Sequence, residues 1–350
     1  MKRYVRTNIR QLEGYIPGEQ PGEKRYIKLN TNENPYPPSP RVRDSITTEM
    51  DSNLKIYPDP ECRKLLRAAS RVYQISESNI LAGNGSDELL AILSRVFLGE
   101  KDRAVFPSPT YTLYDTLVKI QGGVPEEVPF PDDFSLPKGI QKKRGKLIFL
   151  ANPNSPSGTF TKIETLRAVA DSFRGIVVID EAYVDFAEKS AIQLVKDKEN
   201  VVVLRTFSKS FSLAGIRLGL AFAPEWIIEE MRKVKDSYNV NSLTLAAGTA
   251  ALGHTSWMKK NVRKVVATRT HLVSSLVSLG FEVFPSEANF VLARIKGKSL
   301  KSLYLDLKKR RILVRYFDIP RLFDSVRISV GTGEETGSLL RIMGEILKKG

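Results

Sequence analysis

The chain has 350 residues, of which 42% are apolar, 9% aromatic and 27% charged, as in an ordinary folded protein of about two domains. Lysine and arginine (54) outnumber aspartate and glutamate (39), and the net charge of +15 favours an anionic partner or substrate. This composition excludes disordered, collagen-like and low-complexity proteins, and no apolar run reaches the roughly 18 residues of a membrane-spanning helix.

The N-terminal sequence MKRYVRTNIR leads into polar residues and lacks the apolar segment of a signal peptide. We therefore expect a cytoplasmic protein that does not bind membranes. The single cysteine, Cys62, cannot form an internal disulfide bond. His254 and His271 are the only histidines, too few for a Cys/His zinc site, so we expect no metal.

Residues 1–35 are rich in proline, glycine and asparagine, and they predict an extended arm that packs with a smaller domain. From there to residue 240, short apolar runs alternate with helical patterns such as 161–173. Several runs are apolar throughout, which is typical of strands buried on both faces. We therefore expect an α/β large domain over 36–240 whose mainly parallel sheet is flanked by helices. The strand runs are 103–107, 146–152, 175–180, 200–206 and 217–223.

Residues 241–350 alternate helical and strand patterns in a way that predicts a smaller α+β domain. Its basic helix is expected near 296–311, and Tyr304 is the only aromatic residue within it. A nucleic-acid surface would interleave more aromatic residues, so we interpret the basic helix as a solvated face and expect no nucleic-acid partner.

Polar residues that directly follow the apolar strands are candidates for a site, because ligands of α/β sheets bind at the carboxyl ends of the strands. Asp180 closes the run 175–180, where a buried carboxylate needs a cation nearby or serves to cap the next helix. Tyr183 could lie in the same crevice or act as a packing residue. Lys209 follows the run 200–206, and a lysine in such a crevice can form a Schiff base with an aldehyde.

The segment GNGSDE follows the short run 79–82 and predicts a tight turn into a helix. Gly85 permits the turn, Ser86 is a plausible N-cap, and backbone N–H groups at a helix N-terminus hold anions. Arg217 would add a fixed cation. An aldehyde-reactive lysine, an anion site and a lone carboxylate together fit pyridoxal 5′-phosphate.

The ordered motifs YPPSP, YPDP, GNGSDE, PTY, NPNSPSG, DEAYVDF, RTFSKSFSLAGIRLG and VRISVGT resemble those of fold-type I aminotransferases. Among these, the chain is most similar to the histidinol-phosphate aminotransferases, from about Tyr15 to Thr332. The resemblance implies the fold-type I architecture, a pyridoxal-phosphate cofactor and a homodimer.

The resemblance also implies roles for individual residues. Lys209 would hold the cofactor as a Schiff base and then shuttle a proton, Asp180 would pair with the pyridinium nitrogen, and Tyr183 would hydrogen-bond the 3′-oxygen. The other expected cofactor contacts are Tyr111 on the ring, Gly85, Ser86, Ser208 and Arg217 at the phosphate, and Tyr57 from the neighbouring subunit.

The substrate would be held by Arg327, which matches the arginine that binds the α-carboxylate. Tyr15 and Arg315 match positions that contact the substrate phosphate, and Asn32 and Asn34 would lie nearby as the arm folds over the site.

The chain departs from the family at 152–158, where Asn-Pro-Asn-Asn-Pro-Thr-Gly is usual and Ser155 replaces the second central asparagine. Three arrangements at the 3′-oxygen stay open. Ser155 could donate a shorter hydrogen bond, Asn154 could swing in, or Tyr183 could act alone.

The resemblance implies amino transfer between histidinol phosphate and 2-oxoglutarate, giving imidazole-acetol phosphate and L-glutamate in histidine biosynthesis. The alternatives within the fold are an aromatic amino acid aminotransferase and a lyase like threonine-phosphate decarboxylase. A basic DNA-binding protein of the same fold is disfavoured, since the motifs leave no room for a helix-turn-helix extension.

Overall fold

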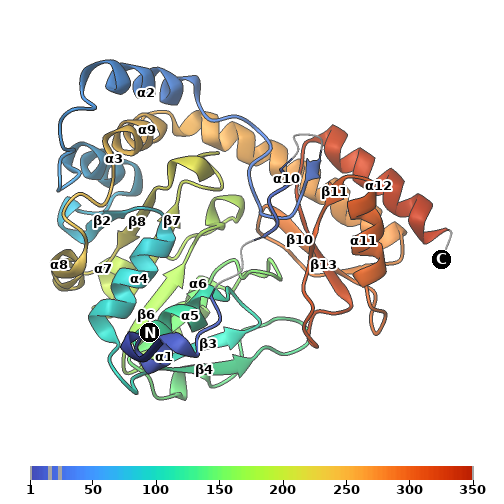
Figure 1. The fold of residues 1–350 in the computed structure, drawn as a ribbon, viewed down its shortest axis with the longest axis horizontal. Coiled ribbons are helices and arrows are strands. Elements are labelled where there is room, and N and C mark those ends of the chain that lie inside the picture. Colours follow the sequence, from blue (N-terminus) through green and yellow to red (C-terminus); the bar gives the residue numbers. More distant parts are fainter. Residues whose placement is uncertain (1, 15–17, 23–25, 349–350) are drawn as a thin grey trace.

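The computed structural model describes residues 2–14, 18–22 and 26–348. A seven-stranded sheet lies on the left of Figure 1 and a four-stranded sheet on the right, and β1 and β11 form a separate two-stranded sheet. The strands are β1 (Ile27–Lys28), β2 (Ile80–Gly83), β3 (Arg103–Ser108), β4 (Val124–Pro129), β5 (Leu147–Ala151), β6 (Ile176–Asp180), β7 (Val201–Thr206), β8 (Gly219–Phe222), β9 (Glu282–Val283), β10 (Phe290–Arg294), β11 (Ile312–Leu313), β12 (Arg315–Tyr316) and β13 (Ser325–Ser329).

Seven strands form the large sheet in the order β2-β8-β7-β6-β5-β3-β4. β8 runs antiparallel to both of its neighbours, and the remaining pairs are parallel. Every residue of β6 and β7 is buried, which is why both strands are apolar up to their carboxyl ends, where Asp180, Arg205 and Thr206 lie. The predicted α/β fold with a mainly parallel sheet is confirmed.

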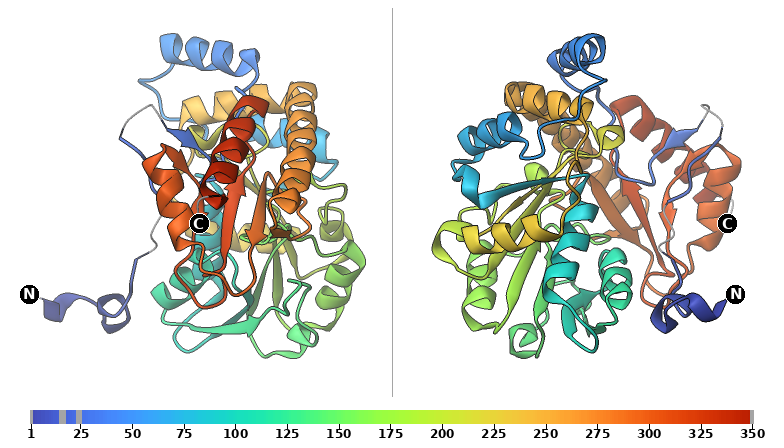
Figure 2. Two further views of the ribbon diagram at one scale, coloured as in Figure 1. Left: turned by 90° about the vertical axis from the view of Figure 1, so that its right-hand side faces the viewer. Right: turned by 60° about the vertical axis from the view of Figure 1, so that its left-hand side comes forward.

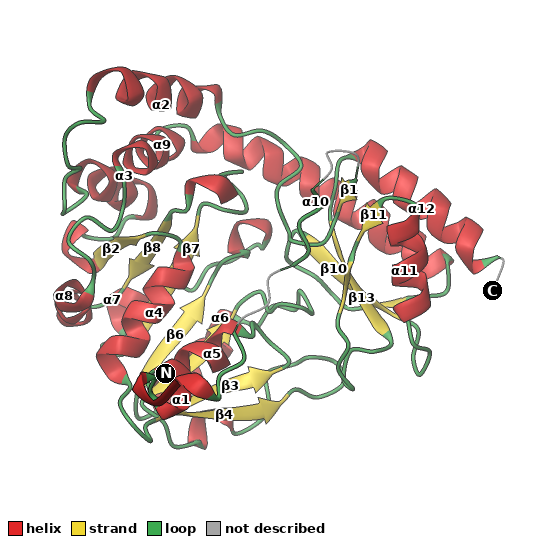
Figure 3. Cartoon of the chain, in the orientation of Figure 1, coloured by secondary structure: helices red, strands yellow, loops and turns green. Residues whose placement is uncertain are grey.

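Helices cover both faces of the large sheet (Figure 3). One face packs against α3, α6, α7 and α9, and the other against α4, α5 and α8. The helices, including the short 3-10 helices marked η, are η1 (Lys2–Tyr4), α1 (Thr7–Arg10), α2 (Pro40–Ser52), α3 (Arg63–Tyr73), η2 (Glu77–Asn79), α4 (Ser86–Phe97), α5 (Leu113–Ile120), η3 (Ile140–Lys142), α6 (Ile163–Ser172), η4 (Val184–Phe186), α7 (Leu194–Asp197), η5 (Ala214–Ile216), α8 (Glu225–Val234), α9 (Ser242–Leu252), α10 (Thr255–Ser278), α11 (Lys301–Lys309) and α12 (Gly333–Leu347).

The smaller sheet is antiparallel, in the order β12-β13-β10-β9. Its core includes residues of α10, α11 and α12, and α12 begins with a capping box between Thr332 and Glu335. No helix of the described residues is long and apolar enough to cross a membrane.

The N-terminal segment touches both halves of the molecule. Arg6 and Asn8 donate side-chain hydrogen bonds to the last carbonyls of α5, whereas β1 pairs in parallel with β11 of the other half. Figure 2 shows η1 and α1 at the periphery of the molecule. α1 and β1 interrupt the extended conformation that the sequence predicts for residues 1–35.

Two further details differ from the sequence expectations. Gly85 is the N-cap of α4, with φ +84°, and Ser86 is the first helical residue. The sequence did not predict β4 as a strand, because its two glutamates and two prolines are unlike the apolar pattern of the buried strands. Such residues are tolerated there because β4 is at the edge of the sheet and pairs with β3 alone.

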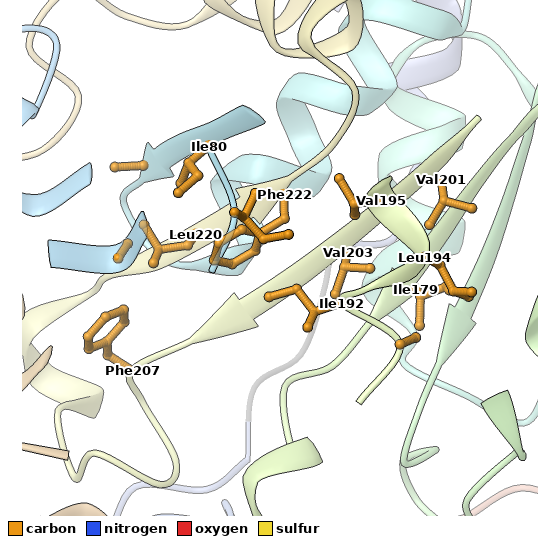
Figure 4. Close-up of a cluster of buried hydrophobic side chains, with 14 of the residues drawn as sticks. Ile80, Ile179, Ile192, Leu194, Val195, Val201, Val203, Phe207, Leu220 and Phe222 are labelled. Carbon is orange, nitrogen blue, oxygen red and sulfur yellow. The ribbon is translucent and has the colours of Figure 1, made fainter. Parts of the chain in front are cut away.

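The apolar cluster in Figure 4 joins the large sheet to the helices on one of its faces. Phe222 at the end of β8 is fully buried there and makes an edge contact with Tyr73, with ring centroids 5.0 Å apart.

We expect Phe222→Ala to lower the free energy of unfolding by about 3–5 kcal/mol, because it removes a buried ring and leaves a cavity. Urea denaturation of the cofactor-free protein measures the loss. Val277→Ala on α10 is the control, since Val277 is 56% exposed and its loss should cost about 0.5 kcal/mol or less. Equal effects of the two substitutions would contradict this account of the core.

Candidate active site

A cavity of about 310 Å³ lies at the carboxyl ends of the large sheet and reaches the smaller sheet. The loops after β3, β5, β6 and β7 and the turn after β2 converge on it, as the sheet topology predicts. The residues singled out from the sequence that line the cavity are Asn32, Ser86, Tyr111, Ser155, Asp180, Tyr183, Ser208, Lys209, Arg217, Arg315 and Arg327.

Four other predicted residues do not line the cavity in the described part of the chain. Gly85 lies directly behind the turn, Asn34 and Asn154 bond to loops of the site, and Tyr57 is on the outer surface. Tyr15 lies outside the described residues.

Asp180 supplies a buried carboxylate at the end of the central strand β6. Its side chain is on the same side of the strand as those of Ile176 and Val178, the side that packs against α5. There the Tyr114 hydroxyl donates to Asp180 Oδ2 at 2.8 Å. The backbone N–H of Ala182 donates to Oδ1 at 3.2 Å. No ion pair joins Asp180 to a cation among the described residues. Burial raises the pKa of Asp180 to about 6, and the Tyr114 hydrogen bond opposes this increase.

Lys209 projects its amine into the cavity from the loop after β7. Its Nζ donates to the carbonyl of Thr31 at 3.1 Å and lies 5.7 Å from the centre of the Tyr183 ring. Asn34 holds the loop by donating to the carbonyls of Lys209 and Ser210 at 3.1 and 3.2 Å. The lysine is therefore placed by the N-terminal segment as well as by its own strand.

The turn from β2 into α4 forms a cradle for an anion. A Cβ at Gly85 would lie 2.5 Å from Nη2 of Arg217, so glycine leaves the space that the guanidinium needs. Arg217 donates to Ser208 Oγ at 3.4 Å and pairs with Asp87 at 3.2 Å. Backbone N–H groups of the first turn of α4, a hydroxyl and a guanidinium together suit a phosphate.

Arg315 and Arg327 lie directly opposite each other on β12 and β13. Arg327 donates to Ser155 Oγ at 3.1 Å and to the carbonyl of Asn30 at 2.8 Å. Both guanidinium groups lie over the ring of Phe317, at 5.4 and 5.6 Å from its centre. Like charges placed opposite each other destabilise a strand pair, so this wall is suited to an anionic ligand.

Ser155 and Asn154 of the segment 152–158 have different hydrogen-bond partners. Ser155 lines the cavity and accepts the hydrogen bond from Arg327. Asn154 is 3% exposed and accepts from Thr110 Oγ1 at 2.7 Å, while its amide donates to Ser157 Oγ at 2.9 Å. The side chain of Asn154 is thus engaged within its own loop region.

Tyr57 is 78% exposed and stacks on Tyr238 with ring centroids 4.5 Å apart. Other apolar side chains are exposed near it in sequence, namely Met50, Leu54 and Ile56. Within this chain Tyr57 therefore contributes nothing to the cavity.

Sequence reasoning missed two residues of the site. Tyr114, fully buried on α5, supports Asp180, but its position in an amphipathic helix predicts only core packing. Asp87, in the first turn of α4, pairs with Arg217 and accepts from the Tyr111 hydroxyl at 3.1 Å. The spacing of Tyr111 and Tyr114, three apart at the start of a helix, is the signal that places both on one face.

Similarity to known proteins agrees with this geometry. Residues 24–342 match the family "Aminotransferase class I and II". A histidinol-phosphate aminotransferase of Rippkaea orientalis is 43% identical over 342 residues, 98% of each chain. Another, from Rhodopirellula baltica, is 44% identical over 333 residues, 94% of this chain and 92% of the relative.

The fold also has close structural neighbours. The crystal structure of histidinol-phosphate aminotransferase from Sinorhizobium meliloti in complex with pyridoxal-5′-phosphate matches with a TM-score of 0.92 and 26% identity. The match covers 100% of this chain and 98% of that one.

Asp180 gives the cofactor-free protein a specific pH dependence. Its pKa is about 6 in the folded chain and about 3.9 when unfolded, so its contribution to stability is complete below pH 4 and is lost as pH rises through 6. Between pH 4 and 7.5 the wild type should lose about 3 kcal/mol relative to Asp180→Asn, which cannot titrate. Urea denaturation across this range measures the difference. Parallel pH profiles of the two proteins would contradict the assignment.

Proposed function

Because the chain belongs to the aminotransferase class I and II family, we propose that it transfers an amino group between histidinol phosphate and 2-oxoglutarate. The products are imidazole-acetol phosphate and L-glutamate, a step of histidine biosynthesis. Relatives that span nearly the whole chain are named for this activity. The structural observation that carries the choice of substrate is the pair of arginines, Arg315 and Arg327, on the cavity wall.

The residues present fit pyridoxal phosphate as the cofactor. Asp180 is a buried carboxylate without a described cationic partner, which suits a protonated ring nitrogen. The cradle of Gly85, Ser86, Ser208 and Arg217 suits the phosphate, and a Cβ at position 85 would fill it. Lys209 offers the amine that holds the aldehyde carbon, and Tyr111 is the aromatic side chain that would cover the ring.

When bound, pyridoxal phosphate supplies an electron sink for the charge left when a proton leaves the substrate carbon. Lys209, whose Nζ lies in the cavity, would be the base that removes that proton, hold it on Nζ and deliver it at the cofactor's C4′. The negative charge of Asp180 would keep the ring nitrogen protonated, and the hydrogen bond from Tyr114 orients the carboxylate. Tyr183 lines the cavity beside Lys209, where its hydroxyl would bind the 3′-oxygen.

The two half-reactions bring different anions to one cavity. Glutamate carries carboxylates, whereas histidinol phosphate carries a phosphate and no α-carboxylate. Arg327, held by Ser155 and Asn30, would bind the α-carboxylate of glutamate. Arg315, across the strand pair, would bind the phosphate. Two adjacent cations allow the same wall to serve both substrates.

We infer a homodimer from the exposed apolar surface around Tyr57. An exposed stack of Tyr57 on Tyr238, with Leu54 and Ile56 each 59% exposed nearby, is the kind of surface that a second subunit covers. In a two-fold dimer, Tyr57 would reach the cofactor phosphate of the neighbouring subunit.

The purified enzyme should show a kcat/KM for histidinol phosphate at least about tenfold above its values for phenylalanine and tyrosine, because one arginine–phosphate contact is worth that much. Arg315→Ala should raise the KM for histidinol phosphate about 10- to 100-fold and affect glutamate less. Steady-state kinetics measure both effects.

The control for this test is Arg341→Ala, which removes an exposed arginine of α12 whose ion-pair partner in the described part of the chain is Glu345. It should leave both KM values unchanged. An equal or higher kcat/KM for the aromatic amino acids would indicate an aromatic aminotransferase, and release of carbon dioxide would indicate a lyase.

The dimer can be tested by mixing two impaired chains, Lys209→Ala and Tyr57→Phe. If Tyr57 acts in trans, each hybrid dimer regains one intact site, so random exchange of equal amounts should give roughly a quarter of wild-type activity. Assays at limiting cofactor concentration measure the gain. If Tyr57 acts within its own chain, no site of a hybrid dimer is intact and mixing restores no activity. Sedimentation as a monomer would also rule out the dimer.

A further inference from the structure

A buried chain of hydrogen bonds links the smaller sheet to Tyr183. Ser329 ends β13, the strand that carries Arg327, and it is 2% exposed. Asn32, in the segment after β1, is 1% exposed and lies between Ser329 and Tyr183. The backbone N–H of Asn32 donates to Ser329 Oγ at 2.9 Å, Ser329 Oγ donates to Asn32 Oδ1 at 2.8 Å, and Asn32 Nδ2 donates to the Tyr183 hydroxyl at 3.0 Å.

The direction of this chain follows from its first member. A backbone N–H can only donate, so Ser329 Oγ accepts at that contact and its own proton is available to the Asn32 side-chain oxygen. With the amide turned over, the buried Ser329 hydroxyl would have no acceptor in the described part of the chain, at a cost of about 1–3 kcal/mol. The amide therefore presents its NH₂ group to Tyr183.

The hydroxyl proton of Tyr183 points away from Asn32. Its oxygen accepts from Asn32, and among the described residues no acceptor takes the hydroxyl proton. Because Tyr183 lines the cavity beside Lys209, that proton is available to a molecule in the cavity. The ring is held by an edge contact with Phe290, whose centroid lies 4.9 Å away.

The backbone conformation at residue 32 favours asparagine. Its φ of +60° lies in the left-handed region, which asparagine and aspartate adopt more readily than most residues. The fully buried Asn289 donates to the Asn32 carbonyl at 2.9 Å, so the segment is fixed from a second side.

We propose that Ser329 and Asn32 are positioning residues that fix Tyr183 as a hydrogen-bond donor to the 3′-oxygen of the bound cofactor. This inference rests on the proposed function, since it requires pyridoxal phosphate in the cavity. It accounts for the 3′-oxygen without the asparagine that Ser155 replaces, because Ser155 is bonded to Arg327 and Asn154 to Thr110 and Ser157.

The proposal predicts a spectroscopic signature. A donor to the 3′-oxygen stabilises its anionic form and weakens its hold on the proton shared with the Lys209 nitrogen. The visible absorption of the enzyme-bound cofactor should therefore change at a lower pH in the wild type than in Tyr183→Phe. Loss of this one hydrogen bond should raise the pH midpoint by about one unit.

The decisive variant is Asn32→Asp, which keeps the shape and tolerates the same backbone conformation but can no longer donate when ionised. The Tyr183 proton then turns toward the new carboxylate, and the midpoint should rise as in Tyr183→Phe. Ser329→Ala should raise it in the same direction by a smaller amount, because the amide loses its orientation. Ser325→Ala is the control on the same strand and should leave the midpoint unchanged, since Ser325 Oγ donates to Asp324 and to no other group among the described residues.

A double-mutant cycle separates this mechanism from a direct charge effect. In a Tyr183→Phe background, Asn32→Asp should add no further shift, because the donor is already absent. Additive shifts in the double variant would overturn the proposal. So would an unchanged pH midpoint in Tyr183→Phe, or an unchanged midpoint in both of the single variants Asn32→Asp and Ser329→Ala. If the wild type shows no visible absorption with pyridoxal phosphate, the proposed function itself fails, which is a different result.

Discussion

The burial of the Asp180 carboxylate is the constraint on which the site depends. A charged group at the end of a fully buried strand is costly, and Tyr114 and the N–H of Ala182 meet only part of its needs. A ring cation bound beside Asp180 would complete the arrangement. The large sheet can hold such a group because the strands on both sides of β6 are themselves buried and rigidly paired.

The segment after β1 is the part that joins the two halves into one site. Thr31 accepts from Lys209, Asn32 donates to Tyr183 and Asn34 donates to the lysine loop, all within four residues. The pairing of β1 with β11 anchors this segment to the smaller half. The reactive groups of the large sheet are therefore positioned by contacts that form only when the N-terminal segment has docked.

The sequence predicted what depends on local pattern. Asp180 was found because it closes a run of buried residues, and Lys209 because it lies in the loop after another such run. The topology of a parallel sheet brings these strand ends together. It did not predict the contact of Asn32 with Ser329, since the two are separated by 297 positions and neither lies in a pattern with a period. Tyr114 escaped notice because a buried tyrosine on a helix has the same pattern whether or not its hydroxyl supports a carboxylate.

The cavity is lined by a buried carboxylate, Asp180, and by two arginines, Arg315 and Arg327. Asp180 lacks a described cation on one side of the cavity, and Arg315 faces Arg327 on the other. A buried carboxylate and two arginines placed opposite each other both cost free energy, and ligands of opposite charge would relieve that cost, a ring cation beside Asp180 and a phosphate or carboxylate beside the arginines. Because relief comes only with the right ligand, the same charges that weaken the free protein discriminate between ligands. Stability and specificity are therefore in opposition at this cavity. The buried side chains of Asn32 and Ser329, which are hydrogen-bonded to each other, fix the geometry beside Tyr183 against that strain.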